Sequence, residues 1–198
     1  MSRPDEVFAS APQYDPHPEG QTPLVCVDCI NLGERLEQFP GSPEKIVPKV
    51  VLVFQSGETN REGKLHEVSL EMSLSMGKKA KLRAILEAWR GKSYTDEQAQ
   101  KVPLHKLVGT ACLASIEHKT SASGRTYAAI KTIAPLPKGM SAPALPQWER
   151  PDFYASRADG YAEEVADYLN KINPPTSSTL ADVPAALAED DGDDSLPF

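Results

Sequence analysis

Cations and an aromatic ring lie on both sides of one short polar segment of this sequence. Lys119 precedes the serine- and glycine-containing segment, Arg125 and Tyr127 follow it, and Lys131 comes four residues after Tyr127. Lysine and arginine side chains can bind phosphate groups, and the flat face of a tyrosine can stack on a nucleic-acid base. We therefore expect these four residues to form a surface that suits alternating phosphates and bases. His118, next to Lys119, could also stack on a base, or have only a structural role.

Three more cations are candidates for phosphate contacts. Lys49 lies in a run rich in β-branched residues, and Arg61 and Lys64 lie in the polar segment that follows this run. Arg61 and Lys64 would contact a ligand if their loop folds over it, and would otherwise be ordinary solvated charges. Phe54 and Trp89 fall on apolar faces, so we assign them to the core rather than to base stacking.

The charges of the chain are divided between its middle and its ends. The net charge is −7, but residues 45–138 contain sixteen Lys or Arg against eight Asp or Glu, which leaves −15 for the two flanks. A basic middle with acidic flanks indicates a polyanion-binding domain that carries an acidic tail. The alternative is an ordinary solvated surface, because single lysines usually have no other role.

The three cysteines, Cys26, Cys29 and Cys112, do not suggest a disulfide framework, because their number is odd. Cys26 and Cys29 form a single C-x-x-C in an apparent strand, where alternation would point the two thiols to opposite faces. We expect them to pack in the core rather than to bind a metal, and a metal- or thiol-dependent enzyme is the alternative. Motifs of hydrolases, phosphate-binding loops and metalloproteases do not stand out in the sequence, so we expect no enzyme, no metal and no cofactor.

Alternating and β-branched patterns predict the strands that would hold these side chains. Three strands are expected first, at Pro23–Gly33, Lys45–Gln55 and Leu65–Leu74. Two more strands, at 110–119 and 126–136, should form a hairpin around the polar segment with the cations. The third strand alternates most clearly, with His66, Val68, Leu70, Met72 and Leu74 on one face and Glu67, Ser69, Glu71 and Ser73 on the other.

Helical spacing interrupts the strands and returns near the end of the chain. A short helix should begin at Thr95, which forms a capping box with Gln98, and stop before Pro103. Another helix is expected at 160–172, with an apolar stripe that covers a surface of this domain or of a second copy. Before both, an amphipathic helix within residues 77–91 is predicted by apolar residues at i, i+3, i+4 and i+7, namely Leu82, Ile85, Leu86 and Trp89.

This order of elements predicts an all-β fold with helical insertions. Five strands with a helix between the third and fourth is the order of the OB-fold, a five-stranded, partly open barrel that binds oligonucleotides and oligosaccharides. We expect a disordered N-terminal extension at 1–22 and the barrel at 23–140. A linker with the last helix should occupy 141–172, and a disordered linker with an acidic tip should occupy 173–198.

The final stretch, "AEDDGDDSLPF", combines five acidic side chains with a Leu-Pro-Phe ending. Because like charges repel and little apolar surface is present, we expect a solvated tail. Its last six residues, "DDSLPF", resemble the acidic tip of bacterial single-stranded DNA-binding proteins. The resemblance implies partner binding with the phenylalanine in an apolar pocket and its carboxylate near a basic residue. The residues that would take part are Asp193, Asp194, Leu196, Pro197 and Phe198.

Residues 82–98 and 118–139 resemble phage-encoded single-stranded DNA-binding proteins of replication and recombination modules, and the resemblance covers roughly residues 24–140 in order and spacing. This resemblance implies sequence-independent binding that protects single-stranded DNA during phage DNA replication, recombination and repair. It also implies that the tip recruits a helicase, an exonuclease, a primosome protein or a recombinase mediator. The N-terminal extension departs from the bacterial protein, so its tetramer is not implied, and a homodimer is one option.

Apolar content bears on location. No stretch reaches the roughly twenty apolar residues of a membrane span, and the first twenty residues lack a signal-peptide pattern. We therefore expect a cytoplasmic protein without membrane contact, in the bacterial host if the chain is phage-encoded.

The alternative function is a decoy that binds no DNA and engages host proteins that recognise the tip. A further hypothesis is that the acidic tail occupies the basic groove when DNA is absent.

Overall fold

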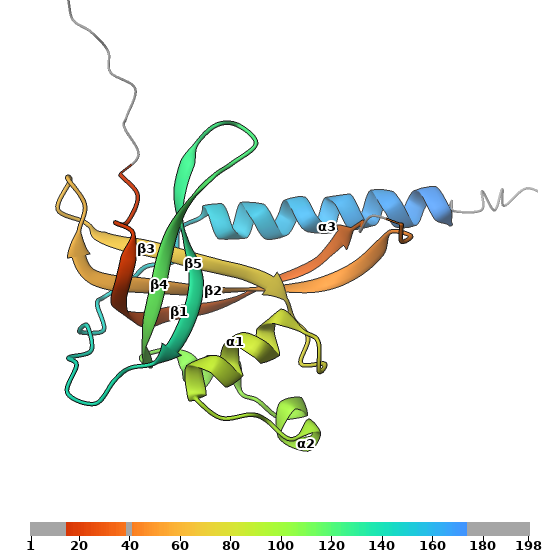
Figure 1. The fold of residues 1–198 in the computed structure, drawn as a ribbon. Coiled ribbons are helices and arrows are strands. Elements are labelled where there is room, and N and C mark those ends of the chain that lie inside the picture. Colours follow the sequence, from red (N-terminus) through yellow and green to blue (C-terminus); the bar gives the residue numbers. More distant parts are fainter. Residues whose placement is uncertain (1–14, 39–40, 174–198) are drawn as a thin grey trace, which may run out of the picture.

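A computed structural model describes residues 15–38 and 41–173, and its centre is a five-stranded antiparallel sheet. The strands are β1 (Gly20–Glu37), β2 (Lys45–Thr59), β3 (Leu65–Ser73), β4 (Ala111–Thr120) and β5 (Thr126–Pro135). Their order in the sheet is β3-β2-β1-β4-β5, so β3 and β5 are the two edge strands (Figure 1). Although β3 and β5 approach each other, no backbone ladder joins them in the described ranges, and the sheet stays open there.

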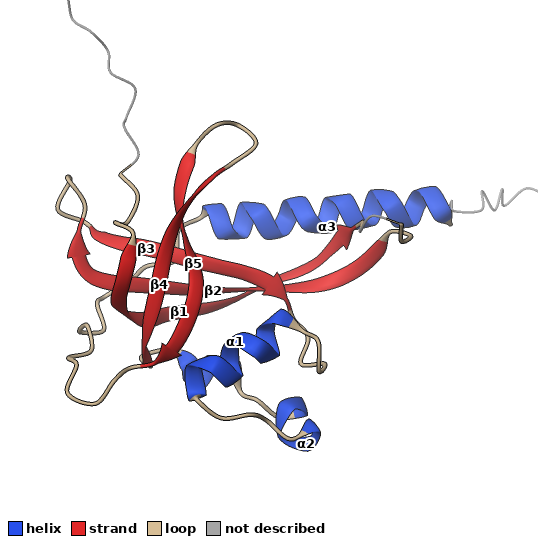
Figure 2. Ribbon diagram, in the orientation of Figure 1, coloured by secondary structure: helices blue, strands red, loops and turns tan. Residues whose placement is uncertain are grey.

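Helices lie against both faces of this sheet. The segment between β3 and β4 forms α1 (Lys81–Arg90), α2 (Asp96–Gln100) and the short 3₁₀ helix η1 (Leu104–Leu107), and α3 (Phe153–Ile172) follows β5. α1 contacts β3 and β5, whereas α3 runs along the other side of the sheet and contacts β1 (Figure 2). Among the helices within residues 15–38 and 41–173, none is long and apolar enough to cross a lipid bilayer.

β2 is buried on both faces because each face packs against a different helix. Leu52 and Phe54 belong to a core that includes the apolar side of α1. Val51 and Val53 belong to a second core with Tyr154 of α3. Full burial of such a side chain contributes roughly 1.5–3 kcal/mol, so the two cores together hold the sheet between α1 and α3.

The prediction that Phe54 and Trp89 are core residues is confirmed. Phe54 is fully buried, Trp89 is 5% exposed, and their ring centroids lie 5.4 Å apart. The indole Nε1 of Trp89 donates to the carbonyl oxygen of Ala111 at 3.0 Å, which satisfies its polar atom inside the core. Neither ring is available to stack on a base.

The predicted order of three strands, a helix and two strands is confirmed. α1 ends at Gly91, which adopts the left-handed conformation that favours glycine, and Thr95 forms the capping box with Gln98. The alternation of β3 is confirmed as well, since its buried residues are His66, Val68, Leu70 and Met72.

β1 is longer than predicted at both ends, and it begins inside the segment that was expected to be a disordered extension. The residues before it also pack on the body. Asp15 pairs with Arg61, and His17 is buried against His66. Residues 15–22 therefore belong to the folded body, while 1–14 and 174–198, which contain the rest of the predicted extension and nearly all of the predicted tail, lie outside the described residues.

The prediction that Cys26 and Cys29 point to opposite faces is wrong. The register changes between Cys26, which pairs with Phe54, and Asp28, which pairs with Val53, so β1 carries a bulge of one residue. Both thiols consequently pack against the core shared with α1. Burial raises the pKa of Cys26 to about 12 and that of Cys29 to about 11. Neutral thiols of this kind suit packing rather than metal or redox chemistry.

α3 begins at Phe153, seven residues before the predicted segment. The additional turns carry Tyr154, which is 2% exposed and packs with β1 and β2 in the second core. The helix therefore covers a surface of its own domain. Leu169 and Ile172, near the end of the helix, remain exposed.

Candidate nucleic-acid interface

An open groove of about 730 Å³ lies between the two edge strands, where the sheet does not close. Its lining comes from β3, from β5 and the β4–β5 hairpin, and from the first residues of α1 and α3. The charged, polar and aromatic side chains of this lining are Lys119, Ser121, Ser123, Arg125, Tyr127, Glu67, Ser69, Glu71, Lys81, Phe153 and Arg157. The predicted residues Lys119, Arg125 and Tyr127 are therefore brought together here.

The β4–β5 hairpin projects beyond the rest of the sheet (Figure 1) and ends in a short, hydrogen-bonded turn. Ser121 N donates to Arg125 O at 2.9 Å, and Gly124 N donates to Ser121 O at 2.9 Å. Gly124 has φ +80°, which a residue with a Cβ rarely adopts. This turn fixes the backbone of Arg125 at the rim of the groove, where the residue is exposed.

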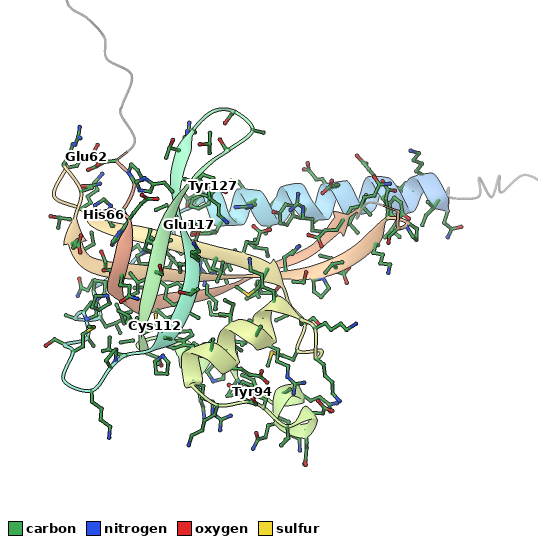
Figure 3. All side chains as sticks on the ribbon, in the orientation of Figure 1. Glu62, His66, Tyr94, Cys112, Glu117 and Tyr127 are labelled. Atoms are coloured by element: carbon green, nitrogen blue, oxygen red, sulfur yellow. The ribbon has the colours of Figure 1, made fainter. Side chains whose placement is uncertain are left out.

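Tyr127 pairs directly with Lys119 across the hairpin. Directly opposed residues of an antiparallel pair share one face of the sheet, so the ring and the ammonium group are neighbours. Tyr127 is 39% exposed and lines the groove; Figure 3 shows it on β5. A ring that can stack and a cation that can bind phosphate thus lie side by side.

Glu117 holds two of the predicted cations. Its two carboxylate oxygens lie 3.2 Å from Lys119 Nζ and 3.4 Å from Lys131 Nζ. The hydrogen bond from Lys119 is the main cause of a lowered pKa of Glu117. Both lysine side chains are more than half exposed, at 52% and 62%, and ion pairs with such exposure are weak. A phosphate group could therefore compete with Glu117, although Lys131 itself is not part of the groove lining.

Arg61 and Lys64, in the loop between β2 and β3, do not line the groove. Arg61 pairs with Asp15 at 3.8 Å, and Lys64 pairs with Glu62 at 3.1 Å. Both cationic side chains are highly exposed. Both residues form surface ion pairs on the loop between β2 and β3, away from the hairpin. They are therefore candidates only for contacts outside the groove.

His118 is tied to the segment that precedes β1. Its ring Nε2 lies 2.8 Å from His17 O, and its backbone N donates to Glu19 Oε1 at 2.7 Å. These contacts agree with the structural role that the sequence left open for His118. The residue is not part of the groove lining.

Lys49 is 5% exposed, and its ammonium group is bound to Glu37 of β1. The pair lies in the part of the β1–β2 ribbon beyond the β1 segment that pairs with β4. A buried lysine with a carboxylate partner serves the fold, because its charge is already compensated. Lys49 is thus outside the groove, and its burial argues against the predicted contact with phosphate.

Lys81, Phe153 and Arg157 line the groove but were not indicated by the sequence patterns. Phe153 and Arg157 are one helical turn apart at the start of α3, ahead of the segment in which a helix was predicted. The available signal was the i, i+4 spacing of an aromatic residue and a cation on one helix face. It was missed because the apolar stripe is most regular only after Gly160.

α3 and the residues before it bind the two glutamates of β3 that line the groove. Glu67 accepts hydrogen bonds from Trp148 Nε1 at 2.8 Å and from the Tyr154 hydroxyl at 3.3 Å. Glu71 pairs with Arg157 at 2.6 Å and accepts from a tyrosine hydroxyl of α3 at 3.0 Å. These contacts satisfy the carboxylate of Glu67 and compensate the charge of Glu71, so this wall of the groove repels an anion less than its sequence suggests.

The predicted tip, with Asp193, Asp194, Leu196, Pro197 and Phe198, lies outside the described residues. The structure therefore bears on the groove and not on the tip. No protein-family model matches this chain, and no curated protein is similar enough to count as a match.

Proposed function

We propose that this protein binds single-stranded DNA without sequence preference, using the groove between β3 and β5. The order of the five strands and the position of α1 between β3 and β4 support an OB-like barrel. The loop between the fourth and fifth strands is one of the two loops that OB-folds use to bind oligonucleotides. In this chain that loop is the projecting hairpin with Arg125.

The observation that carries the proposal is the meeting of Lys119, Arg125 and Tyr127 at one groove. Cations bind the phosphates of a nucleic acid, and each base stacked on an aromatic ring contributes about 1–3 kcal/mol. Bases in a duplex are already stacked on one another and do not present their faces. An exposed ring such as Tyr127 therefore favours a single strand.

The chemistry of the lining also supports binding without sequence preference. Asn and Gln read the edge of adenine through paired hydrogen bonds. Within the described part of the chain, neither residue type lines the groove. Phosphate contacts and stacking are common to all sequences. Every single strand that fits the groove should consequently bind with similar affinity.

We place this activity in phage DNA replication, recombination or repair, where exposed single strands need protection. The resemblance of residues 82–98, 118–139 and 193–198 to phage and bacterial single-stranded DNA-binding proteins supports this role. The tip would then recruit a helicase, an exonuclease, a primosome protein or a recombinase mediator to the covered strand.

Fluorescence anisotropy with a labelled oligo-dT tests the proposal. The protein should bind at low salt, with the logarithm of affinity falling by about 0.7 per contacted phosphate for each tenfold rise in salt. Combined replacement of Lys119, Arg125 and Tyr127 by alanine should weaken binding at least about tenfold, because one stack and two phosphate contacts are lost. A control with Lys92→Ala and Lys106→Ala, two exposed lysines outside the groove, should bind like the wild type. Absence of any complex with the wild type at low salt would refute the proposal.

One observation favours a second function. OB-folds use the face of their second and third strands to bind nucleic acid, whereas here Glu67 and Glu71 of β3 are bound by α3 and the residues before it. A covered face suits the alternative of a decoy that binds no DNA and engages host proteins through the tip. Failure to bind oligo-dT, together with a complex with a tip-binding exonuclease that is lost on deletion of residues 189–198, would favour this alternative.

A further inference from the structure

We propose that α3 forms one wall of the single-stranded DNA interface and that Phe153 is a second base-stacking ring beside Tyr127. This inference rests on the proposed function and adds an element that the hairpin residues alone do not supply. Phe153 belongs to α3 and Tyr127 to β5, yet both line the groove between β3 and β5.

The ring of Phe153 is held in place and is half exposed. It packs on the ring of Tyr154, with centroids 3.9 Å apart and an angle of 34° between the planes. Tyr154 is 2% exposed, and its hydroxyl donates to Glu67 on β3. Phe153 nevertheless keeps 51% of its surface exposed. A ring that is supported on one side and open elsewhere loses little conformational freedom when a base stacks on it.

A single exposed aromatic residue is ordinary on a protein surface, so exposure alone does not indicate a binding site. Phe153 differs because it shares its groove with Tyr127, whose ring is also exposed, and with the cations Lys81 and Lys119. Alternation of rings and cations is the pattern that a strand of bases and phosphates requires. By contrast, Leu169 of the same helix is exposed to a similar degree, at 45%, and lies outside the groove.

α3 also changes the charge of the part of the groove that β3 forms. Arg157, one turn after Phe153, pairs with Glu71 at 2.6 Å and lines the groove. Without this arginine, the carboxylate of Glu71 would face the groove with less compensation and repel phosphates. The first two turns of α3 therefore supply a ring and compensate a negative charge in the same place.

The consequence is a strand path that crosses between two parts of the fold. One base would stack on Tyr127 of β5 and another on Phe153 of α3, with phosphates near Lys119 and Arg125 of the hairpin. Affinity should therefore depend on α3 as well as on the sheet.

The test compares Phe153→Ala, Phe153→Trp and Leu169→Ala in the full chain, with oligo-dT as the ligand. Phe153→Ala should weaken binding by about 5- to 150-fold, the range for the loss of one base stack. The salt dependence should keep its slope, because no phosphate contact is removed. Phe153→Trp should restore the affinity, and Leu169→Ala should leave it unchanged.

Three outcomes overturn the inference. If Phe153→Ala binds like the wild type while Tyr127→Ala does not, α3 is not part of the interface although the proposed function stands. If Phe153→Ala binds weakly but Phe153→Trp does not recover, or if the thermal unfolding midpoint or the oligomeric state changes in parallel, the role of Phe153 is structural. If the wild type binds no oligo-dT, the proposed function itself fails, and the inference falls with it.

Discussion

Two clusters in this protein join cationic side chains to carboxylates, and they differ in how exposed and how fully hydrogen-bonded their cations are. In the first, which we call the α1–α2 cluster, Arg83 of α1 binds two carboxylates, those of Glu87 at 3.0 Å and Asp96 at 2.9 Å. In the second, which we call the groove cluster because its Lys119 lines the groove, one carboxylate binds two cations. Its members are Glu117, Lys119 and Lys131.

The clusters differ in exposure and in the number of donors that are satisfied. Arg83 is 10% exposed in its side chain, and it also donates to Tyr94 O at 2.6 Å and to Met76 O at 3.4 Å. Each of its three nitrogens therefore has an acceptor. Lys119 and Lys131 share a single carboxylate and keep donors that face solvent. A cation that binds an acceptor through every nitrogen holds the fold together, whereas an exposed cation with spare donors can exchange its partner for a ligand.

Replacement of Arg83 should have the largest effect. Arg83→Ala removes one donor each from Glu87, Asp96 and Tyr94 O, which weakens the connection between α1 and the start of α2 although Tyr94 N still donates to Glu87. We expect the thermal unfolding midpoint to fall by several degrees, measured by calorimetry. DNA affinity, measured at a temperature at which the variant is folded, should not change.

Arg90→Ala is the matched control, because Arg90 lies on the same helix and is exposed. Its only aromatic contact in the described structure is the cation–π interaction with Tyr94 at 4.8 Å, so its loss should have a small effect. An Arg83→Ala variant as stable as the wild type would contradict the structural role of the α1–α2 cluster. Loss of DNA binding by the folded variant would show that this cluster also serves the groove.

Local patterns predicted the elements of both clusters, but not the way in which distant elements meet. The alternation of β3 and the capping box at Thr95 depend on near neighbours in the chain, so the sequence indicates them directly. The bulge after Cys26 has no such signal, and it turns Cys29 to the side of the sheet opposite to the predicted one. Lys49 was predicted to contact phosphate, but its ammonium group is bound by Glu37, which comes from a neighbouring strand.

The residues of the candidate site likewise fall into those that local sequence patterns predicted and those that only tertiary contacts bring to the groove. The hairpin residues Lys119, Arg125 and Tyr127 are close in sequence, and they were predicted as a group. Phe153 and Arg157 reach the groove only because α3 packs across the sheet through Tyr154, which is a tertiary contact. Residue spacing within one helix does not reveal which strand that helix will cover.

The pair formed by His17 and His66 predicts an effect of intermediate size, on the pH dependence of stability. His66 is 8% exposed and lies against His17, with ring centroids 5.1 Å apart. Burial, and then the neighbouring His17, lower the pKa of His66, while Asp15 and Glu58 act weakly in the other direction. The folded protein thus prefers neutral His66, and the unfolded chain binds protons more readily as pH falls below about 6.5.

Stability should therefore be constant above that pH and decrease between pH 6.5 and 5.5, by a few degrees in the unfolding midpoint. This interval lies above the ordinary pKa of carboxyl groups, so acid titration contributes little. His66→Leu should reduce the loss, whereas replacement of the exposed His105 by Gln should not. An equal loss in the wild type and in His66→Leu would assign the pH dependence to another group.

The smallest expected effect tests whether the groove cluster exchanges partners. Glu117→Gln removes the carboxylate that binds Lys119 and Lys131, and both ammonium groups become available to phosphates. Affinity for oligo-dT at low salt should rise about threefold to tenfold, and the salt dependence should steepen by up to about 1.4, or 0.7 for each added phosphate contact. The thermal unfolding midpoint should stay unchanged, because exposed ion pairs contribute little to stability.

Glu97→Gln separates this local effect from the change in net charge. Glu97 pairs with Lys101 at 3.3 Å in an exposed i, i+4 pair of α2 and lies outside the groove, so its replacement alters the net charge equally without altering the cations of the groove cluster. If both variants gain affinity to the same extent, the gain reflects the overall field of the protein. If Glu117→Gln weakens binding, Glu117 positions Lys119 and Lys131 for phosphate instead of competing with it, and the groove cluster resembles the α1–α2 cluster more than its exposure suggests.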